Sequence, residues 1–351
     1  MTGKTNFKKL ALFLLILLFC SIFTIGSSIA SDKKIYRWKL QSGYPHGDLS
    51  FELLKGFASD VKKFSNGRLL ITVFADGEIV PLEQLFESTQ RGVLDILHCM
   101  GAFWGGIVPV GEIEFGLPFA YTISEADTFD AKARAIRDFY YKSGFVDLLR
   151  QEYGKHGLYW LDMHTYGGPF VLSTKPLDTY DDWKGVKIRD EGIYTKFHNM
   201  IGARGTYVSG GETYMALKLG TLDAAQWDVS AISGLKWNEV APYWVKAGDN
   251  DDVIGHMLVN DKSWNSLPDE LKRALEKAAK NYWFATVKGY GKEFENAEKM
   301  VAAGTLKESV VNPETVERHK KIAYKIWDEV AKRDAASAKA IKMIKKWRGV
   351  K

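Results

Sequence analysis

Cysteine is scarce in this chain of 351 residues, and its scarcity excludes two kinds of site. The two cysteines are Cys20 and Cys99, and Cys20 falls in an N-terminal segment that we expect to be removed. With Cys99 alone remaining, the mature chain can form no internal disulfide and no cysteine-rich metal site. The seven histidines are scattered without metal-ligand spacing such as His-Glu-x-x-His.

The sequence also lacks the motif of a common hydrolase class and any strong charge excess. No Gly-x-Ser-x-Gly is present, because Ser209 stands in Tyr207-Val208-Ser209-Gly210-Gly211. Residues 1–30 contain three lysines and no acidic residue, and the remaining chain carries 45 basic and 43 acidic residues. This near balance shows no electrostatic footprint of nucleic-acid binding.

The apolar run near the N-terminus is too short for an ordinary membrane span. It covers 16 residues from Leu10 to Ile25, against roughly 18–20 for a spanning helix. Three lysines precede it, and the small-x-small sequence Ser28-Ile29-Ala30 follows. The segment 1–30 therefore predicts a secretory signal peptide that is cleaved from an exported protein. An uncleaved membrane anchor is the alternative.

The remaining chain is long enough for two lobes of ordinary domain size, and its patterns alternate between helix and strand. Strand, helix and strand over 35–41, 49–64 and 69–74 predict a parallel pair. A helix, a glycine stop and a strand occur twice, around Gly92-Val93-Leu94-Asp95 and Gly220-Thr221-Leu222-Asp223. Helices are further predicted over 82–91, 128–152, 193–200, 212–219 and, with breaks near 304 and 312–313, from 267 to 347. Further strands are predicted over 96–100, 158–162, 170–173, 185–189, 206–208 and 254–259, with another ending at 226–228.

One stretch carries a family resemblance. Lys187-Ile188-Arg189, followed by Gly211-Glu212-x-Tyr214-x-Ala216-Leu217-x-x-Gly220-x-x-Asp223, resembles the periplasmic solute-binding subunits of tripartite ATP-independent periplasmic (TRAP) transporters. Asp223-Ala224-Ala225-x-Trp227 is similar to the branch for 2-oxo acids and mannitol or chloroaromatic compounds. The resemblance implies an α/β fold of two discontinuous lobes, a type II-like periplasmic binding protein with a hinge and long C-terminal helices. The expected lobes are 31–159 with 248–285, and 160–247 with 286–351.

Arg189 is the sharpest candidate for ligand binding. A guanidinium matches a carboxylate through two parallel charge-assisted hydrogen bonds. The resemblance implies that Arg189 clamps the ligand's carboxylate. From the residues alone, an ion pair of Arg189 with Asp190 is the competing interpretation.

Gln226, Trp227 and Asp228 end a predicted strand where open α/β sheets bind ligands. Metal-binding relatives commonly have Glu where Gln226 stands, and neutral Gln is a weaker ligand for hard cations. No cofactor is therefore required, and a bound sodium or calcium ion is left open. Asp228 and the acidic cluster from Asp249 to Asp252 could restore a cation site or meet a ligand's amino group. For Asp251 and Asp252 a solvated turn is the favoured alternative.

Five further residues complete the candidate site. The loop from His164 to Pro169 resembles the family's cleft-lining loop and contributes Thr165 and Tyr166, and the aromatic loop 101–106 predicts a cleft wall at Phe103. Tyr44, from the loop after the first strand, and Asn250, from the acidic loop 249–252, complete the set. The implied function is to capture a small organic acid, a monocarboxylate, in the periplasm and to deliver it to a TRAP membrane permease without catalysis. A sensor or receptor-docking protein of the same fold and a periplasmic hydrolase are the alternatives, and a homodimer through the C-terminal helices is left open.

Overall fold

The computed structural model describes residues 34–123, 126–248 and 251–350. Residues 36–351 form one contact unit, which contains two β-sheets and the helices around them. The predicted signal peptide at 1–30 lies outside the described residues. Within the described ranges, no helix is long and apolar enough to cross a membrane.

The first sheet has five strands in the order β2-β1-β3-β10-β4. Their bounds are β2 (Leu69–Phe74), β1 (Tyr36–Ser42), β3 (Ile96–Cys99), β10 (Ile254–Asn260) and β4 (Leu158–Thr165). β1 pairs in parallel with β2 and β3, and β10 runs antiparallel to β3 and β4. The predicted parallel pair is confirmed, and so is the return of the chain to this sheet at β10.

The second sheet has six strands in the order β11-β9-β5-β8-β6-β7. Their bounds are β11 (Lys307–Val310), β9 (Tyr243–Lys246), β5 (Phe170–Ser173), β8 (Ala224–Trp227), β6 (Lys187–Arg189) and β7 (Arg204–Thr206). β6 is parallel to β7 and β8, whereas β5 is antiparallel to β8 and β9. Two edge-region strands, β9 and β11, were not predicted, and β7 begins two residues before its predicted start.

Eleven labelled α-helices and five 3₁₀ turns are found in the described residues. The α-helices are α2 (Leu49–Phe64), α3 (Leu85–Gln90), α4 (Val110–Phe115), α5 (Phe129–Lys142), α6 (Phe145–Gly154), α7 (Ile193–Ile201), α8 (Gly210–Lys218), α9 (Asp261–Ser266), α10 (Asp269–Ala302), α11 (Pro313–Val330) and α12 (Ala335–Arg348). The 3₁₀ turns are η1 (Leu82–Gln84), η2 (Gly101–Trp104), η3 (Tyr180–Trp183), η4 (Val229–Ala231) and η5 (Trp237–Glu239). The single helix predicted over 128–152 is wrong, because Gly144 has a left-handed φ of 83° and separates α5 from α6.

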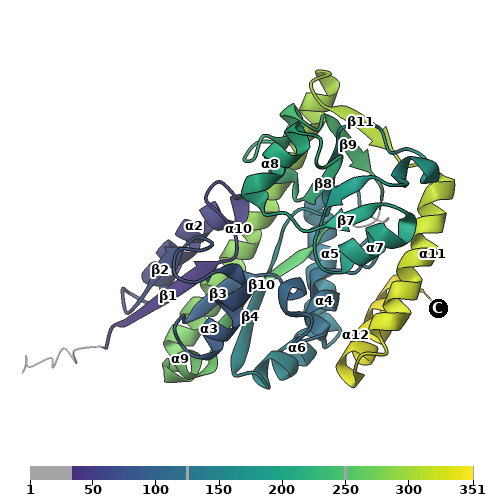
Figure 1. Ribbon diagram of the computed structural model, residues 1–351. Coiled ribbons are helices and arrows are strands. Elements are labelled where there is room, and N and C mark those ends of the chain that lie inside the picture. Colours follow the sequence, from purple (N-terminus) through teal and green to yellow (C-terminus); the bar gives the residue numbers. More distant parts are fainter. Residues whose placement is uncertain (1–33, 124–125, 249–250, 351) are drawn as a thin grey trace, which may run out of the picture. The chain divides into compact units, whose positions relative to one another are not determined.

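The long helix α10 contacts elements of both sheets (Figure 1). On the first-sheet side, the hydroxyl of Tyr282 donates to the carbonyl of Ser50 in α2 at 2.7 Å. On the second-sheet side, the ring of Phe294 lies 6.2 Å from that of Trp244 in β9. β4 stays in the first sheet to Thr165, so the expected lobe boundary between residues 159 and 160 falls inside a strand.

Candidate functional site

A pocket lies where loops around the two sheets meet, with about 380 Å³ of empty volume that is partly open to solvent. Segments around the first sheet contribute Tyr44, Met100, Phe115, Tyr166 and Val253. Segments around the second sheet contribute Pro169, Arg189, Glu191, Gln226, Trp227 and Asp228. The parallel neighbours β6 and β8 end at the same edge, which is why Arg189 and the residues from 226 to 228 come together.

Arg189 is the buried cation of this pocket, with 2% of its side chain exposed. Its Nε donates to the carbonyl of Val208 at 2.9 Å, and its Nη1 donates to the carbonyl of Gln226 at 3.0 Å. Its Nη2 donates to the carboxylate of Glu191 at 3.0 Å. A guanidinium has five N–H groups, so each terminal nitrogen keeps one N–H beyond these three bonds. Those two N–H groups are what a carboxylate fork requires.

The predicted competitor Asp190 is not the partner of Arg189. Its buried carboxylate accepts from the hydroxyl of Thr195 at 2.6 Å and lies 2.8 Å from Nδ1 of His198. Successive residues of an extended chain point to opposite faces, so Arg189 shares its face with Glu191 and not with Asp190. The spacing of two residues was the sequence signal that could have identified Glu191.

Aromatic rings hold the guanidinium from the side. Its central carbon lies 4.4 Å from the ring centre of Trp227 and 5.6 Å from that of Tyr207. Cations over aromatic faces gain roughly 0.5–2 kcal/mol, with the larger values at desolvated sites. Arg189 is thus fixed by stacking as well as by hydrogen bonds before any ligand arrives.

Several buried hydrogen-bonding groups around the pocket have no partner within the described part of the chain. They are the hydroxyls of Tyr44 and Tyr166, Nε2 of Gln226 and Nε1 of Trp227. Buried polar groups in proteins are almost always paired, and an unpaired one costs about 1–3 kcal/mol. These four groups at one pocket are available to a polar ligand.

Asp228 joins the pocket from the end of β8 and caps η4. Its Oδ1 accepts from the backbone N–H of Ser230 at 2.7 Å, and its Oδ2 lies 3.4 Å from the hydroxyl of Tyr290. Burial raises the pKa of Asp228 well above its ordinary value, and the charge of nearby Asp48 raises it further.

The remaining predicted residues do not line this pocket. Thr165 is buried and its hydroxyl donates to Asp252, while Phe103 lies in η2 and packs against the core. Asn250 lies outside the described residues. The pocket residues Met100, Phe115, Glu191 and Val253 were not predicted, since the three apolar ones lie in loops or at a helix end without a local motif. Pro169 belongs to the loop 164–169, which the resemblance assigns to the cleft.

The expected solvated turn at Asp251 and Asp252 is wrong. Asp251 pairs with Lys132 at 2.5 Å. Asp252 is fully buried and accepts from the backbone N–H groups of Gly167 and Gly168 at 3.0 and 3.4 Å. Burial raises the pKa of Asp252 to about 7. Asp252 thus fixes the loop that carries Tyr166, whereas Asp251 holds Lys132 and the backbone N–H of Ile123, and neither carboxylate lines the pocket.

A hard cation finds few ligands here. Calcium takes six to eight oxygen ligands, commonly several carboxylates. In the described ranges no three histidine, cysteine, aspartate or glutamate side chains converge as a metal site. Asp228 has one oxygen committed to its cap, and Gln226 is neutral. The donor set does not fit a calcium ion that must be held by the protein.

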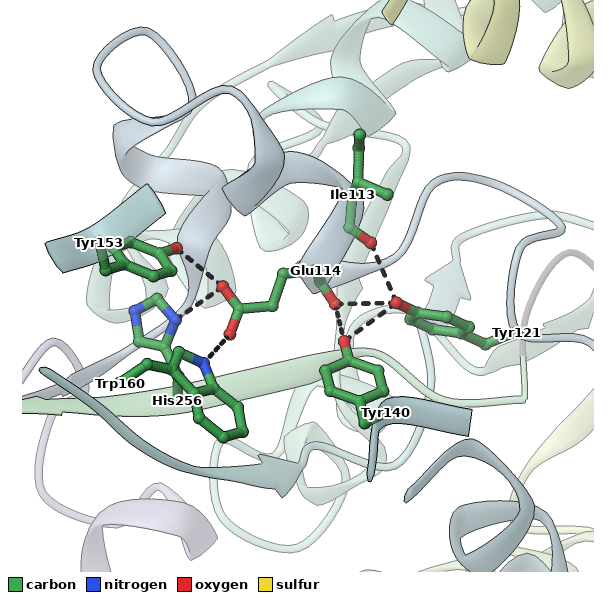
Figure 2. A network of polar contacts seen from close by, with 7 residues as sticks. All are labelled: Ile113, Glu114, Tyr121, Tyr140, Tyr153, Trp160 and His256. Atoms are coloured by element: carbon green, nitrogen blue, oxygen red, sulfur yellow. Dashed lines mark hydrogen bonds and ion pairs between the residues drawn. The ribbon is translucent and has the colours of Figure 1, made fainter. Parts of the chain in front are cut away.

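A second polar cluster, in the core, centres on Glu114 (Figure 2). The Glu114 carboxylate accepts from the hydroxyl of Tyr153 at 2.7 Å and from the indole N–H of Trp160, and it lies 2.9 Å from Nδ1 of His256. Two further tyrosine hydroxyls reach its backbone carbonyl. Glu114 and His256 are fully buried and do not line the pocket, so the cluster stabilises the junction of α4, α6, β4 and β10.

The profile of the bacterial extracellular solute-binding proteins, family 7, matches residues 42–334. A monocarboxylate 2-oxoacid-binding periplasmic protein from Nostoc sp. is 27% identical over 321 residues, covering 89% of this chain and 84% of that protein.

Two solved structures share the fold. One is a TRAP periplasmic solute-binding protein from Colwellia psychrerythraea with bound calcium and pyruvate, with a TM-score of 0.81, 22% identity, and coverage of 90% of this chain and 95% of that chain. The other, from Chromohalobacter salexigens, has bound (S)-(+)-2-amino-1-propanol, with a TM-score of 0.80, 18% identity, and coverage of 90% and 96%. The predicted two-lobe α/β fold is confirmed.

Proposed function

The chain belongs to family 7 of the bacterial extracellular solute-binding proteins, and on that premise we propose that it captures a small organic acid between its two sheets and delivers it to a TRAP permease. Members of this family bind solutes, so the hydrolase alternative is set aside. The Nostoc relative and the Colwellia structure, named for 2-oxo acids and pyruvate, support an acid as ligand.

The observation that carries the proposal is the free capacity of Arg189. Its three internal bonds hold the guanidinium in place and leave two N–H groups for a ligand. The neutral donors on Tyr44, Tyr166, Gln226 and Trp227 stand around the same pocket. A small carboxylate with one further polar group would use these donors and displace little protein structure.

Closure of the two lobes belongs to the same proposal. The lobes assigned from the sequence are carried forward with the first boundary moved beyond Thr165, the end of β4. Ligand contacts made from both lobes favour the closed arrangement over an open one, which is how a hinge protein senses its solute. The periplasmic name of the Nostoc relative supports export. Cleavage near Ser31 is part of the same proposal and is inferred from Ser28-Ile29-Ala30 after the apolar run.

A thermal-shift series on the mature protein tests carboxylate capture. The probes are pyruvate, pyroglutamate and picolinate, each with its carboxamide as the matched control, extended to a library of small acids. A ligand that binds only the folded state raises the melting temperature by mass action. We expect an acid to raise it in a concentration-dependent way and its amide to have little effect. Equal shifts from acid and amide, or no shift from any carboxylate, would contradict the proposal.

Delivery is tested separately, by uptake into proteoliposomes that contain a TRAP permease. Uptake that requires the wild-type protein and leaves the solute chemically unchanged supports transport. Stoichiometric binding without stimulated uptake would contradict delivery and leave a stand-alone sensor.

A further inference from the structure

Two buried carboxylates have oxygens that their caps leave available: Asp228, which lines the pocket, and Asp48, which precedes α2. Asp48 caps α2, where its Oδ1 accepts from the N–H groups of Ser50 and Phe51 at 2.9 and 3.3 Å. Asp228 caps η4 in the same manner through Ser230. The second oxygen of Asp48 has no partner in the described residues, and that of Asp228 has only the 3.4 Å contact with Tyr290. Each carboxylate therefore keeps one oxygen for something else.

The two carboxylates come from segments that belong to the two different sheets, and Asp228 lines the pocket. The charge of Asp48 raises the pKa of Asp228, and burial raises the pKa of both. Asp48 precedes α2 on the first-sheet side, while Asp228 follows β8 of the second sheet. The neighbouring loops touch, since a Cβ on Gly234 would lie 2.8 Å from the carbonyl oxygen of Gly47.

No basic side chain in the described ranges pairs with either carboxylate. The one guanidinium lining the pocket, that of Arg189, is bound to Glu191. Two buried like charges without a cation are costly, because nearby like charges disfavour ionisation of both. A positive charge placed between the free oxygens would remove that cost.

Aromatic side chains surround the pair. The ring of Tyr44 lies 5.0 Å from that of Tyr166 and 6.4 Å from that of Trp227, and the rings of Tyr166 and Tyr290 are 6.5 Å apart. Burial raises the pKa of Asp48, and the indole N–H of Trp227 lowers it in part. The indole nitrogen of Trp227 and Oδ2 of Asp48 make no hydrogen bond of ordinary geometry within the described residues. Aromatic faces together with carboxylates are the usual receptor for an organic ammonium group.

Independent groups beside the pair also point to a ligand. The hydroxyls of Ser230 and Tyr44, which are 2% and 4% exposed, have no partner in the described part of the chain. A hard metal ion is the poorer occupant, because each aspartate offers one oxygen and the other groups nearby are hydroxyls, an indole and an amide. An ammonium needs only a few acceptors, and its substituents pack against the rings.

We propose that the ligand is a zwitterion whose carboxylate binds Arg189 and whose protonated amino group binds between Asp48 and Asp228. This assignment rests on the proposed function and adds the second charged group of the solute. It names amino acids and related ammonium acids as the substrate class, in place of simple keto or hydroxy acids.

Matched three-carbon probes separate the two charged groups. Pyruvate carries the carboxylate alone, L-alanine carries both groups, and 2-amino-1-propanol carries the ammonium alone. Pyroglutamate, proline and prolinol repeat the contrast on one ring, and the standard amino acids with β- and γ-amino acids complete the panel. Melting shifts and calorimetric Kd values are measured on the mature protein with and without chelator.

The variants Asp48→Asn and Asp228→Asn remove charge while keeping an amide oxygen for each cap, because Asn caps helices about as well as Asp. The exposed Asp147→Asn is the matched control. We expect the zwitterion of at least one matched set to bind most tightly. Each cleft variant should reduce the affinity ratio of zwitterion to keto or lactam acid tenfold or more, as loss of a charge-assisted bond implies. The control should leave this ratio unchanged.

The outcomes distinguish this assignment from the function on which it rests. If keto or lactam acids bind as tightly as their zwitterions, if chelator abolishes binding, or if no ammonium acid binds, the ammonium assignment is overturned while carboxylate capture can stand. The ammonium assignment is also overturned if both cleft variants keep the wild-type ratio. If 2-amino-1-propanol or prolinol binds and no carboxylate does, the proposed function itself fails.

Discussion

Replacement of Arg189 by lysine separates ligand binding from structural support. Lysine keeps the positive charge but has no planar fork, and it cannot reproduce the three internal bonds of the guanidinium. A hydrogen bond to a charged group contributes roughly 1.5–3 kcal/mol. Loss of one such bond to the ligand should therefore raise Kd about tenfold to a hundredfold.

The same substitution also lowers the stability of the free protein. The buried carbonyl of Gln226 loses its donor, which costs about 1–3 kcal/mol, and the half-buried carbonyl of Val208 loses its donor too. Melting temperature and Kd must consequently be measured on the same preparation, with the acid identified by the thermal-shift series. Arg204→Lys, at an exposed position on the adjacent strand β7, is the matched control and should change neither quantity.

The substitution Glu191→Gln should change the affinity for the acid in the direction opposite to Arg189→Lys. The carboxylate of Glu191 occupies one N–H of Arg189 and repels an incoming anion. The Glu191→Gln protein, which lacks this negative charge, should therefore bind the acid several-fold more tightly than the wild type. The clamp is refuted if Arg189→Lys lowers the melting temperature while Kd stays within about threefold of the wild type. In that case Arg189 supports the structure and does not bind the carboxylate.

Three other predictions concern the rest of the chain. Glu114→Ala should lower the free energy of unfolding in urea by about 3–5 kcal/mol, because the buried donors on Tyr153 and Trp160 and the ring of His256 lose their acceptor. A change below about 1 kcal/mol would contradict a stabilising role of the cluster. In the folded state Asp252 keeps its proton to about pH 7, whereas its ordinary pKa is 3.8. The free energy of unfolding of the wild type should therefore fall as pH rises from about 4 to 7, and in Asp252→Asn this fall should be smaller by up to about 4 kcal/mol. Equal slopes of unfolding free energy against pH in the two proteins would refute the prediction. Intact-mass measurement of exported protein should show a chain that begins near Ser31, whereas a mass that includes residues 1–30 would exclude cleavage.

The local sequence pattern predicted an element correctly where the signals for that element lie within its own segment. The predicted bounds of α2 and β2 match the observed ones, since α2 has Asp48 as its cap and an apolar face, and β2 is a short β-rich run after the turn at Asn66 and Gly67. The ends of the strands at Arg189 and Trp227 were also predicted from the sequence, because a β-rich run precedes each of these side chains.

Tertiary context decided the features that were missed. β9 and β11 are four residues each, and their pairing joins segments far apart in the sequence. Met100, Phe115 and Val253 reach the pocket from the ends of three different elements, so no single window of sequence contains them. Phe103 and Thr165 were assigned from loops whose neighbours do approach the pocket, but their own side chains contact the core and Asp252.

The placement of the acidic pair connects recognition with closure. Asp48 precedes a helix beside the first sheet and Asp228 follows a strand of the second, so a hinge motion that parts the two sheets would separate the two carboxylates and return them to water. Bringing them together without a cation works against closure, since each disfavours ionisation of the other. A ligand that carries an ammonium group removes this repulsion only in the closed state. Its affinity for the two states therefore differs, and that difference is the free energy available to shift the protein toward closure.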